Sequence, residues 1–218
     1  MRSIKKFIIF KLTLLSFVFS NQDQQVIINV LEQDKNHVVL EYIITDFNIN
    51  EVNIKNEIYH DIDLNDEPDF LNKYSPKLPH INRSLIIPDG SSMDVSILNS
   101  EYNEYRNINV LPSKGNPTRN IDINKIPYSK GSVYNNDSNY PGNIIELDDP
   151  YILRNYRGQV LQINPFQYNP VQKLLRVYSY MIVEIEFTGT NFVNAFNREI
   201  RSSDKLVKDY YYLYSDRF

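Results

Sequence analysis

The 218-residue sequence contains no cysteine and no tryptophan. Without cysteine, this chain cannot form disulfide bonds, bind zinc through thiolates or carry a cysteine nucleophile. It therefore has to fold on its hydrophobic core alone. Six glycines stand against eleven prolines, which favours strands joined by rigid turns. The 17 tyrosines and 11 phenylalanines favour a sheet-rich core lined with aromatic rings.

The chain begins like an export signal. Basic residues precede an apolar run over residues 7–19, which is too short to span a bilayer. Val18 and Ser20 fit the −3 and −1 positions of a signal-peptidase site. We therefore predict a secretory signal peptide over residues 1–20, cleaved after Ser20, with an uncleaved membrane anchor as the alternative. The remaining residues, 21–218, would be secreted, periplasmic or exposed at the cell surface.

The remaining chain is acidic. It holds 19 lysines and arginines against 27 aspartates and glutamates, a net charge of −8. Nucleic-acid binding needs clustered basic residues, so we expect no nucleic-acid partner. We also expect no stable membrane insertion after signal cleavage, and nothing in the sequence calls for a cofactor. The length suits one domain with a core of ordinary size.

Short apolar runs separated by turn residues recur along the chain and predict an all-β domain. About nine such strands indicate an antiparallel β-sandwich. Apolar residues at helical spacing add a short C-terminal helix over about residues 203–214. The predicted strands cover residues 25–31, 36–44, 51–59, 82–87, 93–98, 143–147, 151–153, 157–163 and 174–187.

The last of these runs, residues 174–187, alternates most clearly. Such alternation is typical of a strand with one buried and one solvated face. The predicted buried side chains are Leu175, Val177, Met181, Val183, Ile185 and Phe187. The predicted solvated ones are Arg176, Tyr178, Tyr180, Glu184 and Glu186.

No residues form a recognisable catalytic set. The three histidines, at positions 37, 60 and 80, are scattered and lack a partner pattern. The carboxylates Glu146, Asp148 and Asp149 could suggest a glycosidase pair, but their place beside Pro150 favours a simple turn. The chain is therefore predicted not to be an enzyme.

Residues 60–71 form a predicted acidic loop. Its carboxylates are the hard oxygen ligands that Ca²⁺ prefers. An EF-hand alignment that starts at Asp61 fails, because Asp66 takes the glycine position and Asn72 the glutamate position. We predict a solvated loop and assign no metal site, with calcium binding by residues 60–69 left open.

A lone arginine, Arg119, lies between Thr118 and Asn120 in a polar stretch over residues 112–124, which we predict to be an exposed loop. Exposed arginines usually serve solubility. A guanidinium on a projecting loop can also fill an acidic pocket and form two parallel hydrogen bonds with a carboxylate. Arg119 is therefore the candidate binding residue.

Residues 108–187 carry a long, ordered set of motifs. They are LPSKG (111–115), KIPYSKG (125–131), YPGNI (140–144), DPYILRNYRGQV (149–160), NPFQYNPVQKLLRVY (164–178) and MIVEIEF (181–187). With these motifs the chain resembles the amino-terminal propeptide of the gingipain-type secreted cysteine peptidases. SPKLPHINRSLIIP (75–88) fits the region upstream, and the resemblance is weak over residues 26–71.

The resemblance implies a β-sandwich that covers the catalytic domain of a cognate peptidase, keeps the zymogen latent and assists folding. Arg119 matches the arginine that enters the specificity pocket of arginine-specific members. Processing would follow Arg119 and Arg217. Lysine-specific members exist, and Lys114 and Lys125 flank the loop, so the specificity stays open. The catalytic domain is expected to be absent from this chain, which ends at Phe218.

The alternative interpretation is an exported β-sandwich adhesin or carbohydrate-binding module. Aromatic rings on a protein surface can stack against sugar rings. The tyrosines predicted to do so are Tyr178, Tyr180, Tyr210 and Tyr211.

Overall fold

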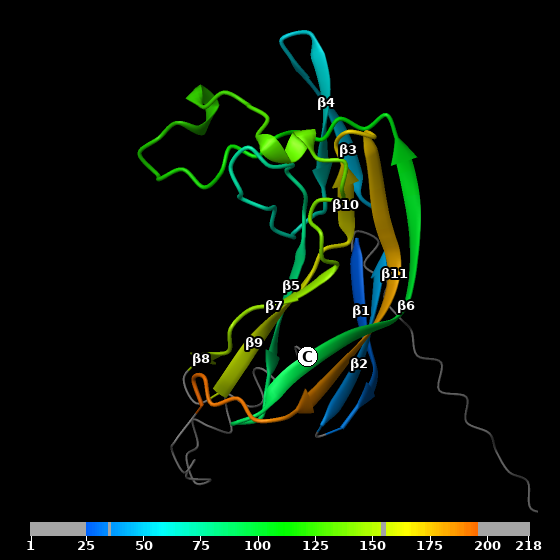
Figure 1. Ribbon diagram of the computed structural model, residues 1–218, viewed down its shortest axis with the longest axis vertical. Helices are drawn as coiled ribbons and strands as arrows, with labels where there is room; N and C mark the ends of the chain where they lie inside the picture. Colours follow the sequence, from blue (N-terminus) through cyan, green and yellow to red (C-terminus); the bar gives the residue numbers. More distant parts are fainter. Residues whose placement is uncertain (1–24, 35, 154–155, 196–218) are drawn as a thin grey trace, which may run out of the picture.

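The computed structural model (Figure 1) describes residues 25–34, 36–153 and 156–195. The predicted signal peptide with Ser20, the predicted C-terminal helix and Arg217 lie outside the described residues. Regular structure in the described part is almost all β, with eleven strands in antiparallel pairs and two short 3₁₀ turns. The predicted all-β class and antiparallel pairing are confirmed. No helix in this part is long and apolar enough to cross a membrane.

The largest sheet has five strands and is organised around β11 (Leu174–Thr188). β6 (Ser92–Arg106) pairs with β11 along its full length. A strand has only two edges, so β10 (Phe166–Asn169) and β2 (His37–Ile44) share the other edge, one after the other. β1 (Val26–Gln33) extends the sheet beyond β2, and both strands agree with those predicted over residues 25–31 and 36–44.

β6 is longer than its sequence predicts. The predicted strand ends at Leu98, whereas the observed strand continues to Arg106. The second half is polar and exposed, so it lacks the alternation that marks a half-buried strand. Its pairing with β11 holds this half in the sheet.

The alternation predicted for β11 is confirmed for five of its apolar residues and wrong for Tyr178. Tyr178 is 6% exposed, and its hydroxyl donates to Gln167 Oε1 at 3.3 Å. The pairing of β11 with β6 shifts between Tyr178 and Tyr180. Such a bulge interrupts the strict alternation of faces, so neighbouring residues can both be buried. The five buried apolar residues are Leu175, Val177, Met181, Val183 and Ile185.

A four-stranded sheet surrounds β9 (Tyr156–Ile163). β5 (Ile81–Ile86) pairs with one stretch of β9 over six residue pairs. The short strands β7 (Ile145–Leu147) and β8 (Tyr151–Leu153) pair with different parts of β9. These strands agree with the predicted ones to within two residues at each end.

β3 (Asn48–Ile54) and β4 (Glu57–Asp63) form a separate hairpin. The predicted strand over residues 51–59 is wrong, and so is the start of the predicted loop at 60–71. The turn consists of Lys55 and Asn56, with φ values of 52° and 66°. Asparagine tolerates this left-handed conformation, but lysine gives no sequence signal for it.

One hydrophobic cluster joins buried residues from all three sheets. Leu40 and Met181 come from the five-stranded sheet, Ile62 from β4, and Leu161 from β9. Each of them is at most 4% exposed. The three sheets therefore share one packed interior.

Candidate functional site

The candidate site is the segment over residues 113–131, here called the projecting loop, which Figure 1 shows in green beside the β3–β4 hairpin. Both of its ends are attached to one residue, Tyr74. The Tyr74 backbone N–H donates to the Ser113 carbonyl at 2.9 Å, and the Gly131 N–H donates to the Tyr74 carbonyl at 2.8 Å. Ser113 also donates its N–H to the Ser75 carbonyl at 2.8 Å. The loop therefore starts and ends on the same rigid segment.

A Ser-Lys-Gly tripeptide stands at each end of the loop, and both glycines are required by close packing. Gly115 has φ of +81°, and a Cβ there would lie 2.9 Å from Lys73 Cβ. A Cβ on Gly131 would lie 2.9 Å from Tyr74 Cβ and 3.1 Å from the Tyr74 carbonyl oxygen. The prediction that the whole of residues 112–124 is exposed is wrong at its start, because this backbone pairs with the segment at Tyr74 and Ser113 is only 5% exposed.

The lysine of the first tripeptide stabilises the loop from inside. The Lys114 ammonium donates to the Ile123 carbonyl at 3.0 Å. It also lies 4.1 Å from the centre of the Tyr128 ring, which is cation–π distance. Lys114 thus links the beginning of the loop to its second half.

The lysine of the second tripeptide attaches the loop to the β3–β4 hairpin. The Lys130 ammonium donates to Glu57 Oε1 at 2.9 Å and to Asn109 Oδ1 at 3.1 Å. Asn109 in turn donates to Glu57 Oε1 at 3.0 Å. The hydrogen bond from Lys130 and a second one from the Tyr59 hydroxyl hold the pKa of Glu57 below its ordinary value. Glu57 is therefore a carboxylate at neutral pH.

Two buried tyrosines support the segment that leads into the loop. The Tyr134 hydroxyl donates to the Val110 carbonyl at 2.9 Å, and the Tyr168 hydroxyl donates to the Ile108 carbonyl at 3.0 Å. Burial raises the pKa of both phenols, that of Tyr168 to about 12. Both hydroxyls therefore remain protonated donors across the physiological range.

Arg119 occupies the tip of the projecting loop. The Ile121 N–H donates to the Thr118 carbonyl at 3.0 Å, so Arg119 and Asn120 form the two central residues of a β-turn. The side chain of Thr118 also hydrogen-bonds that of Asn120. Arg119 is exposed, and within the described ranges its guanidinium makes no hydrogen bond or ion pair. The predicted exposure of Arg119, Thr118 and Asn120 agrees with the structure.

A 3₁₀ turn, η1 (Ile123–Lys125), follows the tip directly. The Asp122 side chain caps it by accepting from the Asn124 N–H at 2.9 Å. None of its three residues is buried. The chain after Arg119 is therefore folded by local hydrogen bonds and not by packing.

The histidines have structural roles. His37 Nε2 lies 3.1 Å from Glu184 Oε1, and His60 Nδ1 accepts from the Asn109 N–H at 3.0 Å. His80 stacks on Phe70 with 4.5 Å between ring centres, and burial lowers its pKa. The three imidazoles lie in separate surroundings, as their scattered positions predict.

Two of the acidic residues considered as calcium ligands, Asp61 and Asp69, share a cationic partner. The Lys77 ammonium lies 2.7 Å from Asp61 Oδ1 and 3.2 Å from Asp69 Oδ2. No group of three or more metal-ligating side chains in the described part of the chain is placed to hold a metal ion. The carboxylates Glu146, Asp148 and Asp149 are exposed.

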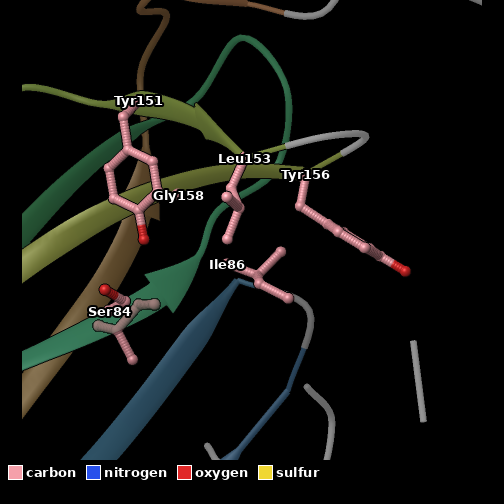
Figure 2. A pocket seen from close by; sticks show the side chains of 7 residues that line it. Ser84, Ile86, Tyr151, Leu153, Tyr156 and Gly158 are labelled. Atoms are coloured by element: carbon pink, nitrogen blue, oxygen red, sulfur yellow. The ribbon is translucent and has the colours of Figure 1, made fainter. Parts of the chain in front are cut away.

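An apolar pocket of about 140 Å³ lies between β5, β8 and β9 (Figure 2). The Tyr151 ring lies against Gly158, where a Cβ would lie 2.7 Å from Tyr151 Cζ. No charged side chain lines the pocket. Its lining is apolar apart from the side chains of Ser84, Tyr151 and Tyr156.

Sequence reasoning missed the buried Arg157, which is 2% exposed. Its guanidinium donates to four backbone carbonyls at 2.8–3.1 Å. Backbone acceptors leave no side-chain pattern in a sequence, so no signal could have identified this role. The four acceptors belong to Pro88, Ser91, Asn191 and Val193.

A known protein family matches most of this chain. The sequence pattern of the Propeptide_C25 family matches residues 20–208. The chain belongs to the Propeptide_C25 family. The resemblance to gingipain propeptides that the sequence motifs predict is thereby confirmed.

Two curated relatives of this Propeptide_C25 chain come from Porphyromonas gingivalis. Gingipain R1 is 42% identical over 127 residues, which are 58% of this chain and 13% of the relative. Lys-gingipain HG66 is 22% identical over 125 residues, which are 55% of this chain and 7% of the relative. The chain thus corresponds to a small part of these much longer proteins.

Two solved structures resemble the fold. One is a complex of Porphyromonas gingivalis RgpB pro- and mature domains, with a TM-score of 0.75 and 30% identity over 87% of this chain and 95% of that one. The other concerns zymogenic latency of gingipain K from the same organism. Its TM-score is 0.66 at 16% identity, over 75% of this chain and 93% of that one. At that identity the second match concerns the fold alone.

Proposed function

We propose that this chain is the inhibitory propeptide of a gingipain-like secreted cysteine endopeptidase and is not itself an enzyme. It covers the catalytic domain of its cognate peptidase, keeps the zymogen latent during export and assists its folding. Membership of the Propeptide_C25 family supports this, as does the likeness to a pro-domain solved in complex with its mature domain. The observation that carries the proposal is the exposed Arg119 at the tip of a loop with both ends attached to Tyr74.

Arg119 acts as a substrate-like side chain in the specificity pocket. Its guanidinium forms two parallel hydrogen bonds with a pocket carboxylate, as planar guanidinium groups do. A loop that is already ordered loses less conformational entropy on docking, so a short contact binds tightly. The attachments at Ser113 and Gly131 supply that order.

An arginine-specific peptidase is the better match than a lysine-specific one. Identity to Gingipain R1 is 42%, against 22% to Lys-gingipain HG66. The ammonium of Lys114 is already bonded to the Ile123 carbonyl, whereas Arg119 is exposed at the tip. Processing follows Arg119 in the loop and Arg217 near the end of the chain.

The finer features of the fold belong to the same proposal. We infer that the five-stranded and four-stranded sheets form the two layers of a β-sandwich, which the hydrophobic cluster shared by their buried residues supports. Residues 1–20 direct export with cleavage after Ser20, and the propeptide acts outside the cytoplasm.

The test measures inhibition of the mature domain of Porphyromonas gingivalis RgpB by the parent chain and by Arg119→Ala. Arg119→Ala removes a side chain that is buried in the pocket on docking, so it should raise the inhibition constant by at least about thirtyfold. Arg106→Ala is the matched control, because Arg106 is an exposed arginine at the end of β6. The pocket role of Arg119 is wrong if both variants inhibit as well as the parent.

A further inference from the structure

The peptide bond between Arg119 and Asn120 is spanned by non-covalent contacts. The Ile121 N–H donates to the Thr118 carbonyl at 3.0 Å. The Lys114 ammonium donates to the Ile123 carbonyl, also at 3.0 Å. Each of these bridging contacts joins a residue before the bond to a residue after it.

The two halves of the loop are also attached separately. The half before the bond is fixed through the Ser113 carbonyl, and the half after it through the Gly131 N–H, both to Tyr74. Lys114 adds a second bridge by lying over the Tyr128 ring. The Asp122 cap keeps η1 folded, so the Ile123 carbonyl stays where Lys114 reaches it. A break between Arg119 and Asn120 would therefore leave the new chain ends close together.

We propose that Lys114 is a positioning residue that makes the peptidase re-form the Arg119–Asn120 bond faster than it hydrolyses it, so that processing after Arg119 is slow. This inference rests on the proposed function, in which Arg119 fills the specificity pocket. It explains how a loop that presents a substrate-like arginine remains an inhibitor.

The chemistry balances without any further reagent. The thiolate of a cysteine peptidase attacks the Arg119 carbonyl carbon, the bond to Asn120 nitrogen breaks, and that nitrogen takes a proton from the catalytic imidazolium and leaves as an amine. A thioester to Arg119 remains. The retained amine then attacks the thioester, restores the peptide bond, frees the thiolate and returns the proton to the imidazole.

Retention of the amine decides the outcome. Water competes for the thioester and would complete hydrolysis. A well-oriented neighbouring group reacts at an effective concentration of roughly 10⁵–10⁸ M, far above that of liquid water. The contacts from Lys114 to Ile123 and Tyr128 keep the amine of Asn120 in reach.

The experiment follows the Arg119–Asn120 bond by mass spectrometry in the full chain mixed with mature RgpB of Porphyromonas gingivalis. Intact chain and chain cut at this bond are each incubated with a small amount of the peptidase until their composition is constant. The variants are Lys114→Met, which removes the ammonium but keeps the length, and Asp122→Ala. Lys125→Met is the control, because it removes one positive charge from η1 in the same loop but leaves the contacts of Lys114 in place.

The parent and Lys125→Met should reach the same mixture of intact and cut chain from both starting points. Lys114→Met should raise the ratio of cut to intact chain by roughly tenfold, because one charge-assisted hydrogen bond is lost. It should also shorten the time for which the chain inhibits the peptidase. Asp122→Ala should shift it in the same direction, and it provides the test if Lys114→Met does not fold.

Two failures are distinguishable. If the parent inhibits but Lys114→Met and Asp122→Ala give the same mixture as Lys125→Met, the role of Lys114 is overturned and the proposed function stands. If the parent does not inhibit the peptidase at all, the proposed function fails, and this inference fails with it.

Discussion

The clearest prediction concerns Gly131, where the second half of the projecting loop meets Tyr74. In Gly131→Ala the new methyl group would lie 2.9 Å from Tyr74 Cβ and 3.1 Å from the Tyr74 carbonyl oxygen. Carbon atoms in favourable contact stand about 3.5–4.0 Å apart. The obstructing atoms are backbone and Cβ, so no rotation of a side chain can relieve the overlap. The loop end has to move away from Tyr74.

The cost follows from two effects. Overpacking of this kind costs about 1–3 kcal/mol. The hydrogen bond from the Gly131 N–H to the Tyr74 carbonyl, 2.8 Å long, is strained or lost at about 1 kcal/mol. A total of about 3 kcal/mol corresponds to a fall in Tm of about 6–12 °C for a domain of this size. Inhibition of the peptidase should weaken as well, because the loop is no longer held in one conformation.

Thermal unfolding by circular dichroism and the RgpB inhibition assay test this together. Gly142→Ala is the matched control, because a Cβ at Gly142 meets nothing within 4 Å. The control should change neither the Tm nor the inhibition constant measurably. The reasoning is refuted if Gly131→Ala unfolds at the same temperature as Gly142→Ala and inhibits equally well.

Two other predictions concern stability. Arg157→Met leaves four backbone carbonyls without their charged donor and should lower the free energy of unfolding by about 3–5 kcal/mol, measured in urea. The control Arg106→Met, at an exposed arginine, should leave the free energy of unfolding unchanged. Equal urea midpoints for the two variants would contradict this prediction. The folded-state pKa of Glu57 is lowered, mainly by the hydrogen bond from Lys130. The contribution of the Glu57 carboxylate to stability is therefore complete above its unfolded-state pKa of about 4.3, and it is lost as the pH falls through the folded-state pKa. The Tm of Glu57→Gln should therefore lie below that of the parent at pH 7, and the gap should close in acid; a gap independent of pH would count against this role.

The sequence predicts most strands because alternation of faces is a local property. β9 and β11 show it, whereas β2 is a run of apolar, β-branched residues, and each of the three agrees with the structure closely. It predicts β6 only in part, since polar residues in the second half carry no alternation and pairing with β11 alone keeps them in the sheet. It misses the hairpin turn at Lys55, because the pairing of β3 with β4 places Lys55 in a conformation that lysine rarely adopts.

By itself, the sequence determined the all-β class, the absence of thiol chemistry, the gingipain-propeptide motifs and the choice of Arg119 as an exposed tip residue. Only the tertiary structure decided how that residue is held. Tyr74 attaches both loop ends, Lys130 joins the loop to Glu57, and Lys114 spans the Arg119–Asn120 bond. These contacts link residues distant in the chain, many through backbone atoms that every residue carries. Such contacts leave no local pattern in the sequence, so only the folded structure shows them.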